Sequence, residues 1–119
     1  MSRFQESDNG IIMDTETNLQ WHVGPDKDTT WDEAKEWVDN LVIDGGEWRM
    51  PTVAELKRLY QKGKGTWNIK IVFRTTGWWV WSRESDLSSA WAVYFFYGRA
   101  CQYSRSYSDL KRVFAVRSI

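Results

Sequence analysis

The chain has 119 residues, the length of a single domain, and its 16 Lys and Arg balance 16 Asp and Glu. A formal net charge of zero argues against nonspecific binding to duplex nucleic acid, and no apolar run is long enough to predict a membrane span. Nine tryptophans are the outlier in composition. We expect most of them to build the core, and some near Trp78 and Trp79 to face solvent as a binding surface.

The start of the chain predicts a hairpin followed by a helix. Residues 10–14 and 19–22 are strand candidates joined by a polar turn. Thr30 and Glu33 then stand at the spacing of a capping box, in which each side chain binds a backbone amide of the other residue. We expect a helix beyond them whose buried stripe comprises Trp31, Ala34, Val38 and Leu41.

A second helix is predicted after Pro51. Proline can continue neither a preceding helix nor a strand ladder, and Thr52 and Glu55 repeat the capping-box spacing. We expect this helix over residues 53–61. Residues 66–78 show no clear period and predict a long loop with a short extended piece at 69–73.

The second half of the chain predicts β structure. The strand candidates are residues 79–82, 90–96, 100–104 and 112–117, separated by polar turns, with a hairpin turn at 97–99. Within 90–96, Trp91, Val93 and Phe95 should share one face, and Ala92, Tyr94 and Phe96 the other. Because both faces are apolar, we expect a central strand that is covered on two sides.

The order of short motifs resembles one known family. The run Trp48-Arg49-Met50-Pro51-Thr52-Val53-Ala54-Glu55-Leu56 is similar to the signature of the Lcl C-terminal (DUF1566) family, and shorter matches lie from residue 8 to residue 117. The resemblance implies one α+β domain over 1–119 with a C-type lectin-like fold: two helices packed on a small, twisted, mostly antiparallel sheet with long loops. Distant relatives of such folds are the formylglycine-generating enzymes and the variable proteins of diversity-generating retroelements.

The cysteines depart from the family pattern. Family members usually pair a cysteine late in the first helix with one in the final strand, and Val38 and Ala115 occupy those positions here. Cys101 is the only cysteine in the chain. Together with a start that resembles no secretory signal, this predicts a cytoplasmic protein, because thiols stay reduced there. The alternative is a secreted or cell-surface protein whose leader was removed.

The residues that could carry chemistry are few, so we expect no enzyme. His22 is the sole histidine, and Cys101 has no neighbouring histidine, which favours a buried small hydrophobe. Formylglycine-generating enzymes use two active-site cysteines. Calcium could be held only by Glu84, Asp86 and Asp109, which solvated loop carboxylates explain equally well. We therefore expect no cofactor, with calcium as a minor alternative.

The segment from Tyr94 to Asp109 is dense in Tyr, Ser and Arg, a composition typical of antibody binding surfaces. A tyrosine-rich edge hairpin with a polar outer face explains it equally well. The candidate ligand-binding residues, including those of the predicted loop at 78–86, are Trp78, Trp79, Glu84, Asp86, Tyr97, Arg99, Gln102, Tyr103, Arg105, Tyr107 and Asp109. Such a surface would also suit the diversified site of a retroelement variable protein.

Functions of different classes stay open. The favoured one is a noncatalytic recognition module that binds a protein or a glycan. The second is a structural or assembly subunit of a larger complex, or an oligomer, with Trp78, Trp79 and Phe96 buried against a partner. The third is a bacterial adhesin domain, which the resemblance connects with glycosaminoglycans; Arg99, Arg105, Lys111 and Arg112 could form its basic patch.

Overall fold

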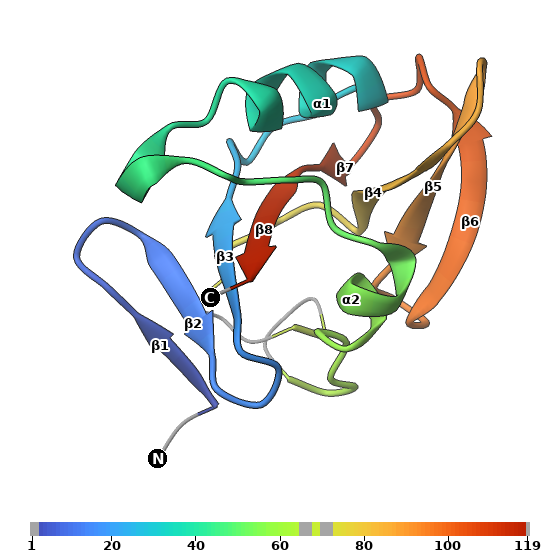
Figure 1. Cartoon of the computed structure of the whole chain (residues 1–119). Helices are drawn as coiled ribbons and strands as arrows, with labels where there is room; N and C mark the ends of the chain where they lie inside the picture. The colour runs from blue at the N-terminus through green and yellow to red at the C-terminus, as the bar shows by residue number, and fades with distance from the viewer. Residues whose placement is uncertain (1–2, 65–67, 70–72, 119) are drawn as a thin grey trace.

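The computed structural model describes residues 3–64, 68–69 and 73–118, which form a small α+β domain with two mostly antiparallel sheets (Figure 1). The first sheet has the order β1 (Phe4–Glu6), β2 (Ile11–Asp14), β3 (Leu19–Val23), β8 (Phe114–Ser118). The second has the order β6 (Arg99–Ser104), β5 (Ser89–Tyr94), β4 (Trp79–Ser85), β7 (Lys111–Arg112). Among the strands of the described residues, only β4 and β7 pair in parallel. The expectation of one small sheet was therefore wrong.

Two helices and a short 3-10 turn connect the sheets within the described residues. They are α1 (Trp31–Asp39), η1 (Ile43–Gly45) and α2 (Val53–Lys57). Both predicted capping boxes are present, because Thr30 and Glu33 cap α1 reciprocally, as Thr52 and Glu55 cap α2. Helix α2 ends four residues before the predicted boundary at residue 61.

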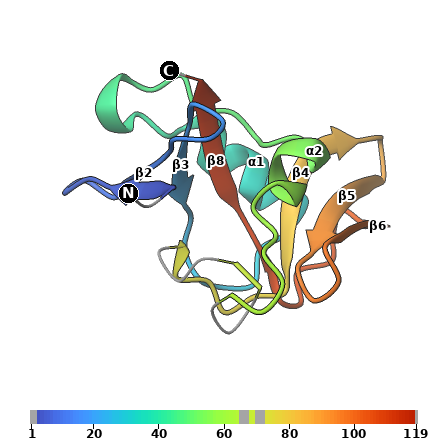
Figure 2. The same ribbon diagram turned by 90° about the horizontal axis from the view of Figure 1, so that it is seen from below.

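Two buried clusters lie on opposite faces of the strands. Along β8, Phe114 and Val116 belong to one cluster and Ala115 to the other, and on β4 Val80 and Trp81 are divided in the same way. Successive residues of a strand point to opposite faces, so the strands separate the two clusters. Helix α2 covers the first cluster with Leu56, and α1 covers the second with Trp31, Ala34 and Val38. Figure 2 shows the domain along a second direction.

Strand β5 is central in its sheet, as predicted, but it is not fully covered on both sides. Ala92 and Val93 are completely buried, whereas 38% of Trp91 is exposed. The expectation that Trp91 lies in a covered face with Val93 was therefore wrong. Phe95 is buried and Phe96 is 44% exposed, but both belong to the turn after β5 rather than to the strand.

Several strands of the structure differ from those predicted from the sequence. Strand β1 was not predicted, and β4 extends three residues beyond residue 82. The single strand expected at 112–117 is divided between β7 and β8, because the chain passes from one sheet to the other near Val113. The extended piece expected at 69–73 lies largely outside the described residues.

Gly98 shapes the predicted hairpin between β5 and β6. Its φ of +71° falls in the left-handed region that glycine adopts without strain. A Cβ atom at this position would lie 2.7 Å from the ring of Tyr60. Glycine is therefore required here twice, by the turn and by the close approach of the segment after α2.

Thr52→Ala is expected to lower the free energy of unfolding by about 1 kcal/mol, because the Thr52 hydroxyl accepts the hydrogen bond of the Glu55 amide at 3.1 Å. Urea denaturation followed by tryptophan fluorescence would measure the loss. The control is Thr52→Ser, which keeps the hydroxyl. Equal losses in both variants would contradict a capping role.

Candidate binding surface

Seven aromatic rings form a continuous surface on the second sheet and its hairpin. We call this set the aromatic surface; it comprises Trp78, Trp79, Tyr94, Phe96, Tyr97, Tyr103 and Tyr107. Its centre is Tyr94, whose ring stacks on Trp79 with centroids 4.4 Å apart. Phe96 and Tyr97 extend the contacts at the hairpin end, with centroids 4.6 Å apart.

Strand geometry explains why these rings meet. Trp79 pairs with Tyr94 in the register of β4 and β5, and Arg99 pairs with Tyr94 across the next strand. Directly paired residues share one face of the sheet, and so does Tyr103, four residues beyond Arg99. On that face α1 covers Trp81 and its neighbours, so the uncovered remainder holds the aromatic surface.

The outer rings of the aromatic surface are accessible. Tyr97 is 60% exposed and Tyr107 is 58% exposed, while Trp79 and Tyr103 are half-buried. Burial raises the pKa of the Tyr103 hydroxyl. The indole N–H of Trp79 neighbours that hydroxyl but makes no hydrogen bond of acceptable geometry within the described part of the chain. The exposed rings of Tyr97 and Tyr107 therefore offer contact area to a ligand, whereas the Trp79 N–H is itself buried.

Lys111 lies beneath these rings, and sequence reasoning missed its role. Its ammonium nitrogen is 4.0 Å from the ring centroid of Tyr103 and 4.6 Å from that of Trp79, with Trp81 and Tyr107 at 5.9 Å. Burial lowers the pKa of Lys111, although nearby carboxylates oppose this shift. Ring faces attract cations, so this lysine holds the rings together from inside.

The structure brings together only some of the predicted site residues. The aromatic ones join the aromatic surface, and the Arg99 guanidinium lies 5.4 Å from the Tyr97 ring centroid. Residues 79–85 form strand β4, so the expected binding loop at 78–86 was wrong. At about 3.3 Å per residue, Glu84 lies roughly 17 Å along the strand from Trp79.

Two of the three acidic candidates accept hydrogen bonds from backbone amides. The Glu84 carboxylate accepts the Val53 amide hydrogen at the start of α2, and the Asp86 carboxylate accepts those of Ser88 and Ser89. Asp109 is exposed. Among the described residues, no group of three or more His, Cys, Asp or Glu side chains is placed to hold a metal ion.

The structure shows the surroundings of His22 and Cys101, the two residues considered for catalysis. Nδ1 of His22 lies 3.0 Å from the Gly10 carbonyl oxygen, and its ring stacks on Trp37. Cys101 is half-buried on β6, rather than buried as expected.

The four cations considered as a basic patch do not form one. Lys111 and Arg112 are 3% and 6% exposed. Arg105 is half-buried, pairs with Asp32 and packs over the Trp31 ring. Arg99 alone is exposed, so the patch expected for a glycosaminoglycan-binding domain was wrong.

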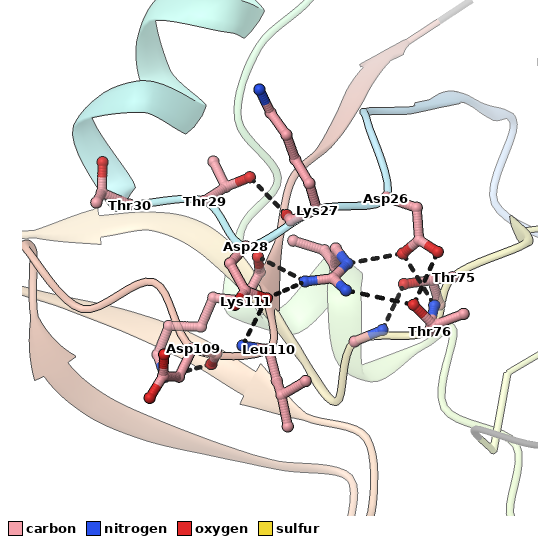
Figure 3. A network of polar contacts seen from close by, with 12 residues as sticks. Asp26, Lys27, Asp28, Thr29, Thr30, Thr75, Thr76, Asp109, Leu110 and Lys111 are labelled. Carbon is pink, nitrogen blue, oxygen red and sulfur yellow. Dashed lines mark hydrogen bonds and ion pairs between the residues drawn. The ribbon is translucent and has the colours of Figure 1, made fainter.

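Arg112 instead joins distant segments of the chain. Its guanidinium donates to the carboxylates of Asp26 at 2.7 Å and Asp28 at 3.0 Å. Figure 3 shows the same carboxylates accepting hydrogen bonds from Thr76 and from the Leu110 amide. Burial raises the pKa of Asp26, but the bonds from Thr76 and Arg112 outweigh it and hold that pKa below its usual value.

A cleft of about 350 Å³ beside α1 was also missed from the sequence. It is lined by Trp31, Lys35, Asp39, Trp48, Arg49, Met50, Arg83 and Ser85. Lys35 pairs with Asp39, and Arg49 pairs with Glu55, so most of its charge is compensated. Its residues come from three separate segments, which no local pattern could have joined.

The family model of the Lcl C-terminal domain matches residues 10–117, which is nearly the whole chain. The chain belongs to this family. A comparison with curated proteins found no match. In this Lcl C-terminal domain, Val38 and Ala115, which stand where the resemblance places a cysteine pair, lie in the same buried cluster. None of the helices in the described residues has the length and hydropathy to cross a bilayer.

Proposed function

We propose that this Lcl C-terminal domain is a noncatalytic recognition module with a C-type lectin-like fold, which binds a protein or a glycan through the aromatic surface. The observation that carries the proposal is the unbroken chain of ring contacts from Tyr97 to Tyr107, whose outer members are exposed. Aromatic rings give a large contact area at a small cost in side-chain entropy, and they dominate the energetics of binding interfaces.

The rings of the aromatic surface are held in place by contacts within the domain, which favours recognition over a loose apolar patch. Tyr94, Trp79 and Tyr103 are half-buried, and the Lys111 ammonium lies 4.6 Å from the Trp79 ring centroid and 4.0 Å from that of Tyr103. Rings that are already fixed before a ligand arrives lose little freedom on binding, so more of the contact energy contributes to affinity.

The double variant Tyr97→Ala/Tyr107→Ala tests the proposal. Both rings are mostly exposed, so we expect a melting temperature close to that of the wild type and a loss of ligand binding. Binding would be measured on a glycan array and by affinity capture from a lysate of the host. The matched control is Val42→Ala/Leu87→Ala, which removes two exposed apolar side chains outside the aromatic surface.

The expected result is a glycan or protein that the wild type and the control retain and the double variant loses. Equal binding by all three proteins would contradict the proposal. A large fall in the melting temperature of the double variant would instead favour the tyrosine-rich hairpin as a purely structural element.

The second candidate is an assembly subunit, and the exposed Phe96 and Tyr97 favour it, because such apolar area is often covered in a complex. Size-exclusion chromatography distinguishes the two: a stable oligomer favours assembly, and a monomer favours recognition. A diversified binding site is a further extension of the proposal. Sibling sequences that differ only within residues 78–110 would support diversification, whereas scatter over the whole chain would contradict it.

We also propose that this domain resides in a reducing compartment. Val38 and Ala115 fill their cluster without a disulfide, and Cys101 is a free thiol on β6. Such a domain gains nothing from an oxidising environment. Thiol titration of Cys101 in protein isolated from the host would test this, and an oxidised thiol would contradict it.

A further inference from the structure

Strand β6 is the outer edge of the second sheet, and both views show no strand of the described residues beyond it (Figures 1 and 2). The Arg105 amide donates to the Ser88 carbonyl at 2.9 Å, in the register that pairs β6 with β5. Backbone groups alternate in direction along an antiparallel strand, so the odd-numbered residues of β6 bond to β5. The N–H and C=O groups of Ala100 and Gln102 therefore point outward, and they have no hydrogen-bond partner among the described residues.

This edge lacks the features that normally prevent pairing with another chain. Proteins protect edge strands by shortness, lysine, proline or a bulge. Strand β6 is six residues long, contains neither lysine nor proline, and keeps a regular register with β5. By contrast β1, an edge of the other sheet, has only three residues and ends in Glu6. The edge of the second sheet is therefore less protected than that of the first: β6 has six residues against three in β1, and its one charged residue, Arg99, lies at its end, which indicates a site for pairing.

Apolar rings flank the open edge on both faces. Tyr103 lies on β6 itself and belongs to the aromatic surface. On the other face Trp91 pairs with Gln102 across β5 and β6, and it is 38% exposed. An added strand would alternate its side chains between these two faces, which is how sheet edges recognise extended peptides.

The charge of the residues around β6 indicates which kind of chain would pair with this edge. Residues 87–108 contain no Asp or Glu, and their two cations are Arg99 and Arg105. Arg105 pairs with Asp32, but Arg99 makes no ion pair in the part of the chain that the structure describes. A second copy would bring two positively charged hairpins together, whereas an acidic segment would be attracted.

We propose that β6 is the docking edge for an extended acidic segment of a partner protein. The segment adds as a further strand, bonds to the outward backbone groups of Ala100 and Gln102, and places a carboxylate near Arg99. Its alternate side chains contact Tyr103. This inference rests on the proposed function and names its ligand as a protein segment rather than a glycan.

Gln102→Pro tests the edge directly, because proline lacks the outward N–H and leaves the bonds between β5 and β6 in place. The probe is a displayed library of random peptides, about twelve residues long so that they exceed the length of a typical strand, selected on the full wild-type chain. We expect the selected peptides to alternate apolar residues with Asp or Glu. Their affinity should fall roughly tenfold or more in Gln102→Pro and stay nearly unchanged in the control Gln102→Thr.

Arg99→Glu is the second variant, in case Gln102→Pro lowers the melting temperature. Arg99 is exposed, so the reversal should leave folding intact and weaken the acidic peptides, while Arg99→Lys should retain them. Selection of basic peptides, selection of none, or binding that is unaffected by both variants would overturn the proposal. So would a concentration-dependent dimer in sedimentation that Gln102→Pro abolishes, since that result assigns the edge to a second copy.

The results for these variants distinguish a failure of the docking-edge inference from a failure of the proposed function. If Tyr97→Ala/Tyr107→Ala abolishes binding but Gln102→Pro and Arg99→Glu do not, the aromatic surface is a recognition site and β6 is not its docking edge. If the edge variants lose peptide binding and the double tyrosine variant keeps it, the edge binds alone and the aromatic surface is not the site.

Discussion

Trp81→Ala is expected to lower the free energy of unfolding by about 3–5 kcal/mol, the range for removing a fully buried tryptophan. Trp81 has no exposed surface and lies in the cluster that joins α1 to the second sheet. Its indole N–H also donates to the Thr29 carbonyl at 2.8 Å in a buried hydrogen bond. The variant would lose ring contacts and leave that carbonyl unsatisfied. Urea denaturation at neutral pH would measure the change.

Two further variants distinguish how much the hydrogen bond and the burial of the ring contribute to the loss of stability in Trp81→Ala. Trp81→Phe keeps an aromatic ring but loses the N–H, and should cost roughly 1–3 kcal/mol. Trp91→Ala removes the same side chain from the adjacent strand, where it is 38% exposed, and should cost less than half as much as Trp81→Ala. Similar losses for Trp81→Ala and Trp91→Ala would show that the two tryptophans are buried alike, contrary to the structure.

Local signals predicted the starts of helices better than their ends. Each capping box depends on two residues three positions apart, so Thr30 and Thr52 could be assigned from spacing alone. The end of α2 at Lys57 is set by tertiary packing, since Leu59 turns into the first cluster and the Tyr60 ring packs against Gly98. Nothing in residues 53–61 encodes those contacts.

Strand patterns could not show which faces are covered. Alternation correctly divided the side chains of β5 between two faces, but Trp91 and Val93 share one face with very different exposure. Coverage depends on how far α2 reaches along the strand, which is a property of the assembled fold. The density of Tyr and Arg at 94–109 did predict the aromatic surface in part. The candidate binding residues chosen from that segment left out Tyr94, whose ring lies at the centre of the aromatic surface.

The roles of Lys111 and Arg112 could not be predicted from the sequence, because their partners are distant along the chain. Lys111 and Arg112 look like members of an exposed patch when only neighbours in sequence are considered. The acidic partners of Arg112 lie 86 and 84 residues away, and the rings around Lys111 come from strands β4 and β6 and the loop after β6. A sequence with balanced charge can therefore contain cations that are fully engaged inside the domain.

Arg112→Met is the second large effect expected, with a loss of about 2–3 kcal/mol at neutral pH. The substitution keeps much of the side-chain volume but leaves Asp26 and Asp28 without their shared cation. Because both carboxylates keep partial access to water, the loss should stay below that of a fully buried pair. The control is Arg74→Met, which breaks the bidentate but exposed pair with Glu6 and should change stability little.

The difference between wild type and Arg112→Met should depend on pH in one direction. The pKa of Asp26 in the folded protein lies below its usual value, although burial opposes the shift, because Thr76 and Arg112 donate to the ionised form. A lowered folded pKa gives stability that is present above the unfolded pKa and is lost as the pH falls through the folded pKa. The stability difference should therefore be complete near neutral pH and shrink below about pH 4. The pairs Arg3–Asp14 and Arg49–Glu55 are present in both proteins, so their own acid titration cancels in the comparison. Urea denaturation of both proteins across this range would measure the difference, and a constant difference would mean that Arg112 stabilises the fold by packing rather than by charge.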